Sequence, residues 1–444
     1  MKIIEYTLGL PPYRRGGLPR YSTDLSVKLS KSNEVYVLYP GEINPLSKKI
    51  KIERKKNKYP FYTIEMKNPL PISLGLGIQN TKYYMQKRDI SNLISFINNV
   101  NPDVIHLHTL MGIPKEFLEY LHRNQIKTIY TTHDFYGLCP KMLDIDPKQE
   151  LRSSKCSYDC MLCRVGPSYK KIIIMQSHLY AKLKESKLIK YIRSQSKSNL
   201  VTQSNYDFFS SEEVNYRYEL RKYYFEMFKL IDIFHFNSSV SKEYFKQYIP
   251  DIKGKIISIT HGGLQDCRRE DDNLNHNTPI RLGYIGPYDE KKGFFRYTKI
   301  LKELSNKGKF EAHFYGDIVD NSIFNNKSFI NHGVLPSLEL NKEYKKLDVL
   351  IVPSLWHETF GYVVLEALLN GTPCLVSSNV GAGDLLPDSW VFKNKSELKN
   401  KLVDLIDDPQ KVEQMKYEVK QLNLPYKIDE HVNRIIRELY KNEI

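Results

Sequence analysis

The sequence predicts an α/β fold built from two parallel-sheet domains that face each other across a cleft. Short apolar segments alternate with stretches of helical spacing at both ends of the chain. A glycine-containing loop follows the first predicted strand of each half, at Gly16 and at Gly286. The middle of the chain interrupts the alternation with cysteines and many lysines. We therefore expect two Rossmann-like domains and a mostly helical insertion in the first.

Length and composition agree with a two-domain globular protein. The chain has 444 residues, of which 41% are hydrophobic and 26% charged. No stretch has the ~20 uninterrupted apolar residues that a membrane-spanning helix needs, and the sequence starts directly in a predicted strand without a signal-peptide pattern. We expect a cytoplasmic protein. The predicted parts are an N-terminal domain (1–264) with an insertion (about 140–235), a linker (265–279), a C-terminal domain (280–425) and a terminal helix (426–444).

The first 40 residues predict a strand, a glycine loop, a helix and a second strand. The loop PPYRRGG is not G-x-G-x-x-G, and Tyr39, Pro40 and Gly41 follow the second strand where a dinucleotide-binding domain has an acid. A nicotinamide-dependent dehydrogenase is therefore disfavoured. Arg14, Arg15 and Arg20 surround the glycines, and are either available to an anionic ligand or are solvated charges of a tight turn.

Two further strands are predicted in this half, over 103–110 and 127–140. Within the second of these segments, His133 and Asp134 fall at the end of the strand, where side chains enter the crevice. His106 alternates with apolar residues, which favours a hydrogen-bonded structural histidine; the role of His108 is left open. Residues 234–250 and 255–263 predict the closing strand, helix and strand of the domain.

The predicted insertion contains a cluster of four cysteines. Cys156, Cys160 and Cys163 form a C-x3-C-x2-C run, and Cys139 can complete a set of four. In a protein expected to be cytosolic, this clustering favours a tetrahedral structural zinc site. The alternatives are an iron–sulfur cluster and reduced, unliganded thiols. The spacing also coincides with the radical-SAM motif, but it lies between two Rossmann-like halves rather than near the start of a barrel.

A strongly basic stretch follows the cysteines. Residues 164–200 contain nine lysines and arginines against the single acid Glu185, interleaved with apolar residues. This pattern fits an amphipathic helix on an anionic membrane surface, or equally a solvated face of the insertion. The net charge of +15 would also suit nucleic acid, but no nucleic-acid-binding module is visible.

The C-terminal half contains the strongest functional pattern. Residues 280–286 predict a strand that ends in glycine, and a loop with Lys292 before Gly293 leads into a helix. Residues 349–354 predict another buried strand, Gly361 to Leu369 a helix and 373–377 the next parallel strand.

Two glutamates flank the start of this helix. Glu358 precedes it at the strand ends, and Glu366 lies two turns in, where a carboxylate can accept hydroxyl hydrogen bonds. The free backbone N–H groups near Phe360, Gly361 and Tyr362 suit an anionic group or sugar hydroxyls. This arrangement predicts a nucleotide-sugar site.

The stretch HETFGYVVLEALLNGTPCL resembles the E-x7-E signature of family 4 glycosyltransferases, which are retaining enzymes of the two-domain GT-B fold. By this resemblance Glu358 holds the donor sugar, the amides of Phe360 and Gly361 bind its hydroxyls, and Glu366 binds the ribose. The resemblance also implies that Lys292 binds the leaving diphosphate. The terminal helix is expected to cross back to the N-terminal domain.

The resemblance also assigns positions outside this signature. Gly16 and Gly17 lie beside the donor phosphates and the acceptor, Val334 meets the base, and His133 contacts the donor sugar near the reacting carbon. The family has an arginine where Pro287 stands, for which Lys291 or Arg296 would have to substitute.

The resemblance implies metal-independent, front-face displacement, so no cofactor is expected for catalysis. Asp144 and Asp146 form a D-x-D, the metal-binding signature of the other main glycosyltransferase fold, which we interpret as a coincidence.

The expected reaction moves a hexose from a nucleoside-diphosphate sugar, UDP among the candidates, to a glycan or lipid-linked glycan, as in polysaccharide biosynthesis. The protein would then act in the cytoplasm or peripherally at the membrane. The alternatives are a soluble small-molecule acceptor and an inactive scaffold, for which Pro287 is the argument.

Overall fold

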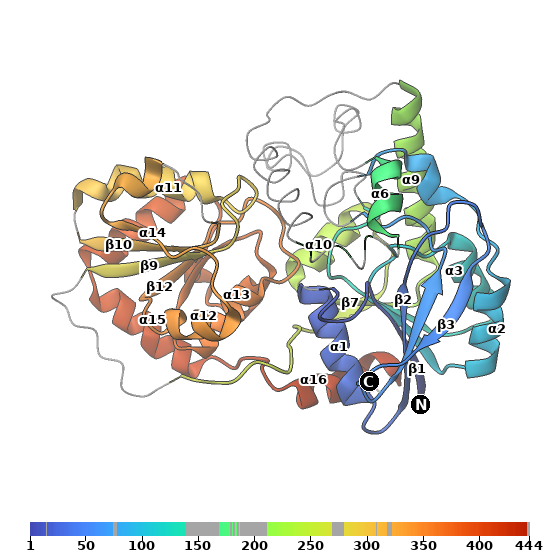
Figure 1. Cartoon of the computed structure of the whole chain (residues 1–444). Helices are drawn as coiled ribbons and strands as arrows, with labels where there is room; N and C mark the ends of the chain where they lie inside the picture. The colour runs from blue at the N-terminus through green and yellow to red at the C-terminus, as the bar shows by residue number, and fades with distance from the viewer. Residues whose placement is uncertain are drawn as a thin grey trace.

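The computed structural model consists of two α/β lobes (Figure 1). It describes residues 1–14, 16–73, 78–138, 168–177, 180, 183, 186, 211–268, 279–307, 309–317 and 322–441. Each lobe contains a sheet of mostly parallel strands with helices on its faces. The two-domain α/β architecture predicted from the sequence is confirmed.

The N-terminal lobe contains an eight-stranded sheet in the order β3-β4-β2-β1-β5-β6-β7-β8. The described neighbours pair in parallel except β3 and β4, which are antiparallel. The strands are β1 (Lys2–Tyr6), β2 (Glu34–Pro40), β3 (Lys51–Lys55), β4 (Tyr62–Lys67), β5 (Val104–Leu107), β6 (Thr128–Thr131), β7 (Ile233–Phe236) and β8 (Gly254–Ile256). Strands β1, β5 and β6 are almost wholly buried, as central strands of a parallel sheet should be.

The helices of this lobe cover both faces of the sheet (Figure 1). They are α1 (Gly17–Leu29), α2 (Ser91–Val100), α3 (Lys115–Arg123), α6 (Tyr169–Met175), α9 (Ser211–Lys229) and α10 (Ser239–Tyr248). Helix α9 falls within the range predicted as an insertion, yet Leu220, Tyr224 and Phe228 are buried in the same apolar cluster as strands β5 and β6. The end of this range is therefore part of the domain core.

The C-terminal lobe contains a six-stranded parallel sheet in the order β11-β10-β9-β12-β13-β14. Its strands are β9 (Ile280–Ile285), β10 (Phe310–Tyr315), β11 (Phe329–Asn331), β12 (Val349–Val352), β13 (Cys374–Ser377) and β14 (Val391–Phe392). Its helices are α11 (Phe294–Leu304), α12 (Ser337–Tyr344), α13 (Tyr362–Leu369), α14 (Lys395–Asp407) and α15 (Gln410–Gln421). The βαβ unit β12-α13-β13 matches the sequence prediction.

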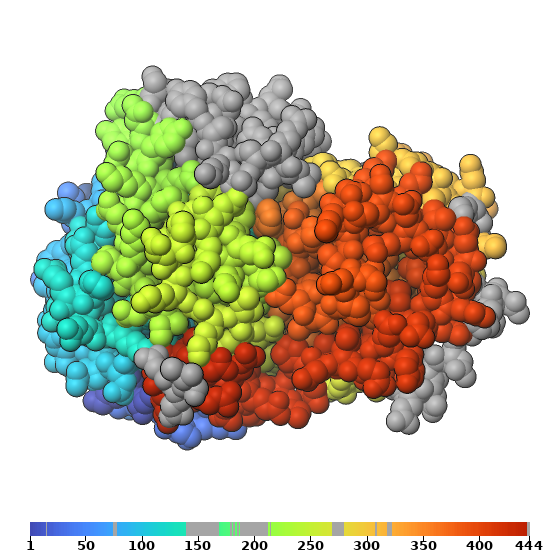
Figure 2. Space-filling view, turned by 180° about the vertical axis from the view of Figure 1, so that it is seen from behind, coloured from blue at the N-terminus to red at the C-terminus, as the bar shows by residue number. Residues whose placement is uncertain are grey.

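The end of the chain returns to the N-terminal lobe. Helix α16 (Ile428–Ile435) and the π-helical turn Ile436–Tyr440 lie beneath that lobe, as the dark red segment in Figure 2 shows. Tyr21 of α1 hydrogen-bonds His431 at 2.8 Å, and the Tyr440 hydroxyl donates to Glu5 at 2.7 Å. The C-terminal segment thus fastens the two lobes together through buried contacts. Among the described helices, none combines the length and apolarity needed to span a membrane.

Candidate nucleotide-sugar site

The turn that begins α13 is held open by a glycine and a neighbouring loop. Gly361 is the N-cap of the helix and has φ of 100°, a conformation that favours glycine. The backbone N–H of Glu358 donates to the Asn379 carbonyl at 2.8 Å, and the N–H of Ala382 donates to the Phe360 carbonyl at 2.7 Å. Within the first turn, the N–H of Val364 donates to the Gly361 carbonyl at 3.1 Å. The first N–H groups of a helix otherwise lack intrahelical acceptors, at the end where the helix dipole favours negative charge.

A cavity of about 180 Å³ lies in front of this turn, at the carboxyl ends of β9 and β12. Lys292, Glu358, Gly361 and Tyr362 line it, together with the 284–287 loop and residues 351–353. The ammonium Nζ of Lys292 lies 3.1 Å from Oε1 of Glu358. Burial is uneven, since the Lys292 side chain is 35% exposed and that of Glu358 only 12%. The cavity therefore pairs a partly exposed cation with a largely buried carboxylate.

The structure shows what occupies the position of the expected arginine. The Pro287 carbonyl accepts a hydrogen bond from the Tyr284 hydroxyl at 2.6 Å, so a side chain of β9 holds this loop. The ammonium of Lys291 lies 5.8 Å from the ring centre of Trp356, and Arg296 is on helix α11. Of the described residues that line the cavity, Lys292 is the cationic one.

Glu366 faces a second cavity, of about 160 Å³, on the other side of α13. Its Oε2 accepts a hydrogen bond from Tyr344 at 3.0 Å, and its Oε1 lies 3.6 Å from Nε2 of His261. Arg20, which the sequence offers to an anionic ligand, also lines this cavity. The His261 ring contacts the Tyr362 ring at 5.1 Å between centroids. Since Tyr362 lines the first cavity and His261 the second, this pair stands between them.

The glycine loop of the N-terminal lobe reaches the start of α13. Gly16 is the N-cap of α1 with φ of 129°, and a Cβ on Gly17 would lie 3.4 Å from the Tyr362 ring. The start of α1 therefore lies close to the start of α13, at a distance that an ordinary van der Waals contact could bridge. Val334 is 70% exposed on the C-terminal lobe. The predicted donor contacts of Gly16, Gly17 and Val334 stay predictions.

His133 and Asp134 lie at the end of β6, close to the same turn. The Thr359 hydroxyl donates to the His133 carbonyl at 2.9 Å across the two lobes. The carboxylate of Asp134 accepts from the backbone N–H of Tyr136 at 3.0 Å, and burial raises the pKa of Asp134 to about 6. His133 thus lies beside the loop that contains Glu358, as its predicted role requires.

The lobes also meet through α10 and the loop after β13. The Ser238 hydroxyl donates to the Thr359 carbonyl at 2.6 Å, and the backbone N–H of Ser239 donates to Asp384 at 2.7 Å. Gly381 lies within this contact, because a Cβ there would stand 2.3 Å from both the Ser238 Oγ and the Thr359 carbonyl oxygen. Glycine at this position lets the lobes close beside Glu358.

Gly381→Ala is expected to slow the reaction at this site by up to about 100-fold, because a misplacement of about 1 Å between catalytic groups has that cost. The methyl group would push Thr359 and Ser238 apart, and with them Glu358 and His133. Gly383→Ala is a matched control, since its Cβ would meet its nearest neighbour at an ordinary 3.6 Å. Initial rates and melting temperatures of both variants test this; equal rates would contradict it.

The buried centre of the N-terminal lobe contains some residues whose roles the sequence predicted and others that it did not reveal. His106 is a structural histidine as predicted, with Nδ1 2.8 Å from the Tyr440 hydroxyl and Nε2 2.6 Å from the Thr131 hydroxyl. His108, left open, hydrogen-bonds both Glu5 and His133. Glu5 was missed, although one acid in the apolar strand KIIEY is a recognisable signal. Tyr362 and His261 were missed because their pairing depends on the meeting of two distant segments.

Metal sites predicted from the sequence fall outside the described residues. Cys139, Cys156, Cys160 and Cys163 are all in this category, so their zinc site stays a prediction. Within the described part, Glu5, His106 and His108 offer three ligand atoms within 4.8 Å of one another. Hydrogen bonds from Tyr440, Thr131 and His133 already occupy this group.

Comparison with known proteins finds a family model that matches the C-terminal part of this chain. Residues 268–422, which contain both glutamates and Lys292, match a family model. That family is Glycosyl transferases group 1. The match covers the C-terminal sheet and the β12-α13-β13 unit that surround the first cavity.

Two curated relatives have recognisable sequence similarity. Protein CapJ of Staphylococcus aureus is 28% identical over 178 residues, which span 36% of this chain and 43% of CapJ. An uncharacterized 42.6 kDa protein in the cps region of Klebsiella pneumoniae is 23% identical over 84% of this chain and 83% of its own length. The match to CapJ thus spans less than half of that protein.

Solved structures share the fold over nearly the whole chain. Sucrose-phosphate synthase from Thermosynechococcus elongatus has a TM-score of 0.55 at 15% identity and full coverage of both chains. HepE from Anabaena, solved with UDP, has a TM-score of 0.55 at 12% identity and 99% coverage of both. WaaG, a glycosyltransferase involved in lipopolysaccharide biosynthesis, has a TM-score of 0.50 at 13% identity, covering 98% of this chain and 99% of WaaG. The chain has the GT-B fold.

Proposed function

We propose that this protein is a retaining glycosyltransferase that moves a hexose from a UDP-linked donor to a glycan or a lipid-linked glycan. The observation that supports it most is the pairing of Lys292 with Glu358 at the N-terminus of α13, with Glu366 on the next cavity along the same helix. A diphosphate needs a cation, which Lys292 can supply. A hexose needs hydroxyl partners, which Glu358 and the N–H groups at the start of α13 can supply. A ribose needs an acceptor for its hydroxyls, which Glu366 can supply. The group 1 match over residues 268–422 agrees with this assignment.

The donor base and the acceptor are proposed from the relatives. HepE has been solved with UDP and with UDP-glucose, which favours UDP as the nucleotide. The description of WaaG favours a lipid-linked or polysaccharide acceptor, as does the cps region of the Klebsiella relative. Lys170 and Lys171 belong to the basic stretch of the sequence and are exposed on α6. Their exposure supports binding of the protein to an anionic membrane surface.

The reaction we propose is a front-face displacement. The bond between the anomeric carbon and the diphosphate oxygen breaks, the acceptor oxygen bonds the same face of that carbon, and the acceptor proton passes to the departing diphosphate. A retaining double displacement would instead need two carboxylates about 5 Å apart, and Glu358 is the carboxylate among the residues that line the first cavity. The protein positions the sugar and stabilises the leaving charge.

Glu366→Ala is expected to weaken binding of the preferred nucleotide sugar by about 10- to 100-fold, because hydrogen bonds to a charged carboxylate contribute about 1.5–3 kcal/mol. Calorimetric titration with UDP-, GDP- and ADP-sugars measures this. Glu339→Ala, on α12 at its exposed face, is the control and should bind like the wild type. If none of these donors binds the wild-type protein, the proposal fails and the inactive scaffold takes its place.

A further inference from the structure

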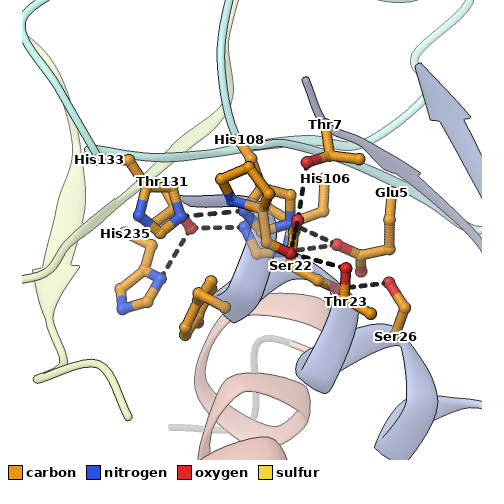
Figure 3. A network of polar contacts seen from close by, with 12 residues as sticks. Glu5, Thr7, Ser22, Thr23, Ser26, His106, His108, Thr131, His133 and His235 are labelled. Carbon is orange, nitrogen blue, oxygen red and sulfur yellow. Dashed lines mark hydrogen bonds and ion pairs between the residues drawn. The ribbon is translucent and has the colours of Figure 1, made fainter. Parts of the chain in front are cut away.

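A buried network of hydrogen bonds connects the first strand of the chain to His133 (Figure 3). Glu5 lies on β1, His108 directly follows β5, and His133 follows β6, so three adjacent strands contribute to it. Glu5 and His108 are completely buried, whereas His133 keeps part of its surface exposed. The network therefore runs from the core of the N-terminal lobe to the face that meets Thr359.

Glu5 is an ionised carboxylate that can only accept hydrogen bonds. Burial by itself would raise its pKa, but the electrostatic effect of His106 and hydrogen bonds with His106 and His108 outweigh it and lower the pKa of Glu5 to about 2. Its Oε1 accepts from the Tyr440 hydroxyl at 2.7 Å. Its Oε2 lies 2.6 Å from Nε2 of His108, so His108 must have its proton on Nε2.

The position of the proton on His108 in turn determines the position of the proton on His133. Burial and the neighbouring His106 lower the pKa of His108 to about 4, so its ring is neutral at physiological pH and its Nδ1 is a bare acceptor. Nδ1 of His108 lies 3.1 Å from Nε2 of His133. Since Nδ1 of His108 can only accept, His133 must donate from Nε2. Its own Nδ1 then has a lone pair, on the side of the ring that points away from His108.

We propose that Glu5 is a positioning residue that acts through His108 to hold His133 in the Nε2–H tautomer, with its bare Nδ1 available as an acceptor for a hydroxyl of the donor hexose. The inference rests on the proposed function for the identity of that hydroxyl. The tautomer itself depends only on the two contacts, of 2.6 Å and 3.1 Å, within the N-terminal lobe. No proton is transferred along the chain; the tautomer is fixed before the donor binds.

The arrangement has a chemical consequence for donor recognition. A sugar hydroxyl can donate to a bare Nδ1 and at the same time accept from a backbone N–H, such as those at the start of α13. In the opposite tautomer His133 would donate, and this pattern of complementary contacts would be lost. Glu5 thus influences the hexose and not the nucleotide, whose ribose and phosphates are expected near Glu366 and Lys292.

The test begins with the wild-type protein labelled with ¹⁵N in histidine. Long-range proton–nitrogen spectra distinguish a protonated ring nitrogen from a bare one, and loss of a signal in His133→Gln assigns the His133 ring. We expect His133 with a protonated Nε2 and a bare Nδ1. A His133 that is cationic or protonated on Nδ1 would overturn the proposal, whether or not the protein is a glycosyltransferase.

Glu5→Met removes the acceptor while keeping a side chain of similar length. His108 can then move its proton to Nδ1 and donate to His133, so the Nδ1–H form of His133 should appear in the spectrum. With UDP-glucose as the probe, we expect kcat/KM to fall by about 10-fold and the affinity for UDP alone to stay unchanged. An unaltered His133 tautomer in a folded Glu5→Met protein would overturn the proposal.

Tyr440→Phe is the matched control, because it removes the hydrogen bond of Tyr440 to Glu5 and its contact with His106 but leaves the 2.6 Å contact between Glu5 and His108 in place. It should lower the melting temperature and leave the His133 tautomer and the kinetics of UDP-glucose unchanged. If His133 lost its Nε2–H form in this variant, any disturbance of the core would change the tautomer. That result would count against a specific effect of Glu5 through His108. If the wild type binds neither UDP nor UDP-glucose, the proposed function fails while the spectra still decide on the relay.

Discussion

Lys292→Ala is expected to lower the rate of the proposed hexose transfer by about 100- to 1,000-fold, the usual cost of removing one group that stabilises charge in a transition state. Lys292 is the cation among the described residues that line the cavity next to Glu358, and Pro287 stands where the family resemblance predicts a second cation. The chain therefore depends on this single ammonium more than a site with both cations would. Release of UDP from the donor, measured with and without acceptor, gives the rate.

Lys299 provides the control, because it is exposed on α11, the helix that begins just after Lys292. Lys299→Ala removes the same charge from the protein and should keep the full rate. The loss in Lys292→Ala should appear mainly in kcat, because the leaving group gains its charge in the transition state. An alanine variant with the wild-type kcat would show that another group neutralises the diphosphate, and would exclude the proposed role of Lys292.

Acidification is expected to destabilise the protein steeply below about pH 6.5, the ordinary pKa of histidine. Burial lowers the pKa of His108 to about 4 and that of His431 to about 3, and electrostatic effects of His106 on the first and of Arg434 on the second add to the shift. In this range the unfolded chain binds protons that the folded chain does not. Stability is therefore complete above pH 6.5 and is lost as the pH falls towards 4 and below.

The size of this effect follows from the shift. For His108 alone, a change from 6.5 to about 4 corresponds to about 3 kcal/mol at low pH. Asp134 opposes it, because its pKa of about 6 lets it regain a proton in the same range. Glu5, with a pKa of about 2, adds a further loss below its ordinary value of 4.5. The net result is a loss of several kcal/mol between pH 7 and about pH 4.

Urea unfolding across this pH range measures the prediction, and one variant separates the contributions. His431→Gln removes one buried histidine and can keep a hydrogen bond to Tyr21, so its stability should depend less on pH. His122→Gln removes an exposed histidine on α3 and should leave the pH dependence unchanged. A wild-type free energy of unfolding that is constant down to pH 5 would contradict the assignment of neutral, buried rings.

The sequence predicted the elements of the fold because its signals are local. The apolar strand before Glu358, the glycine at position 361 and the helical spacing up to Leu369 each follow from backbone preferences, and they became β12, the N-cap and α13. The sequence alone also shows proline at position 287, where the family resemblance predicts arginine. Helix α9 was assigned to an insertion, since its burial against β5 and β6 depends on packing that no short window of sequence contains.

By itself, then, the sequence determined the two α/β lobes and the acids, lysine and glycines at the ends of their strands, because strand and helix periodicity and turn residues are properties of neighbouring positions. Only the tertiary structure decided which of these residues meet. Residue 5 lies beside His108 and Tyr440, Gly17 approaches Tyr362, and Gly381 admits Ser238. Such contacts join segments that are hundreds of residues apart, and packing of the two sheets alone sets their distances, and with them the tautomer of His133.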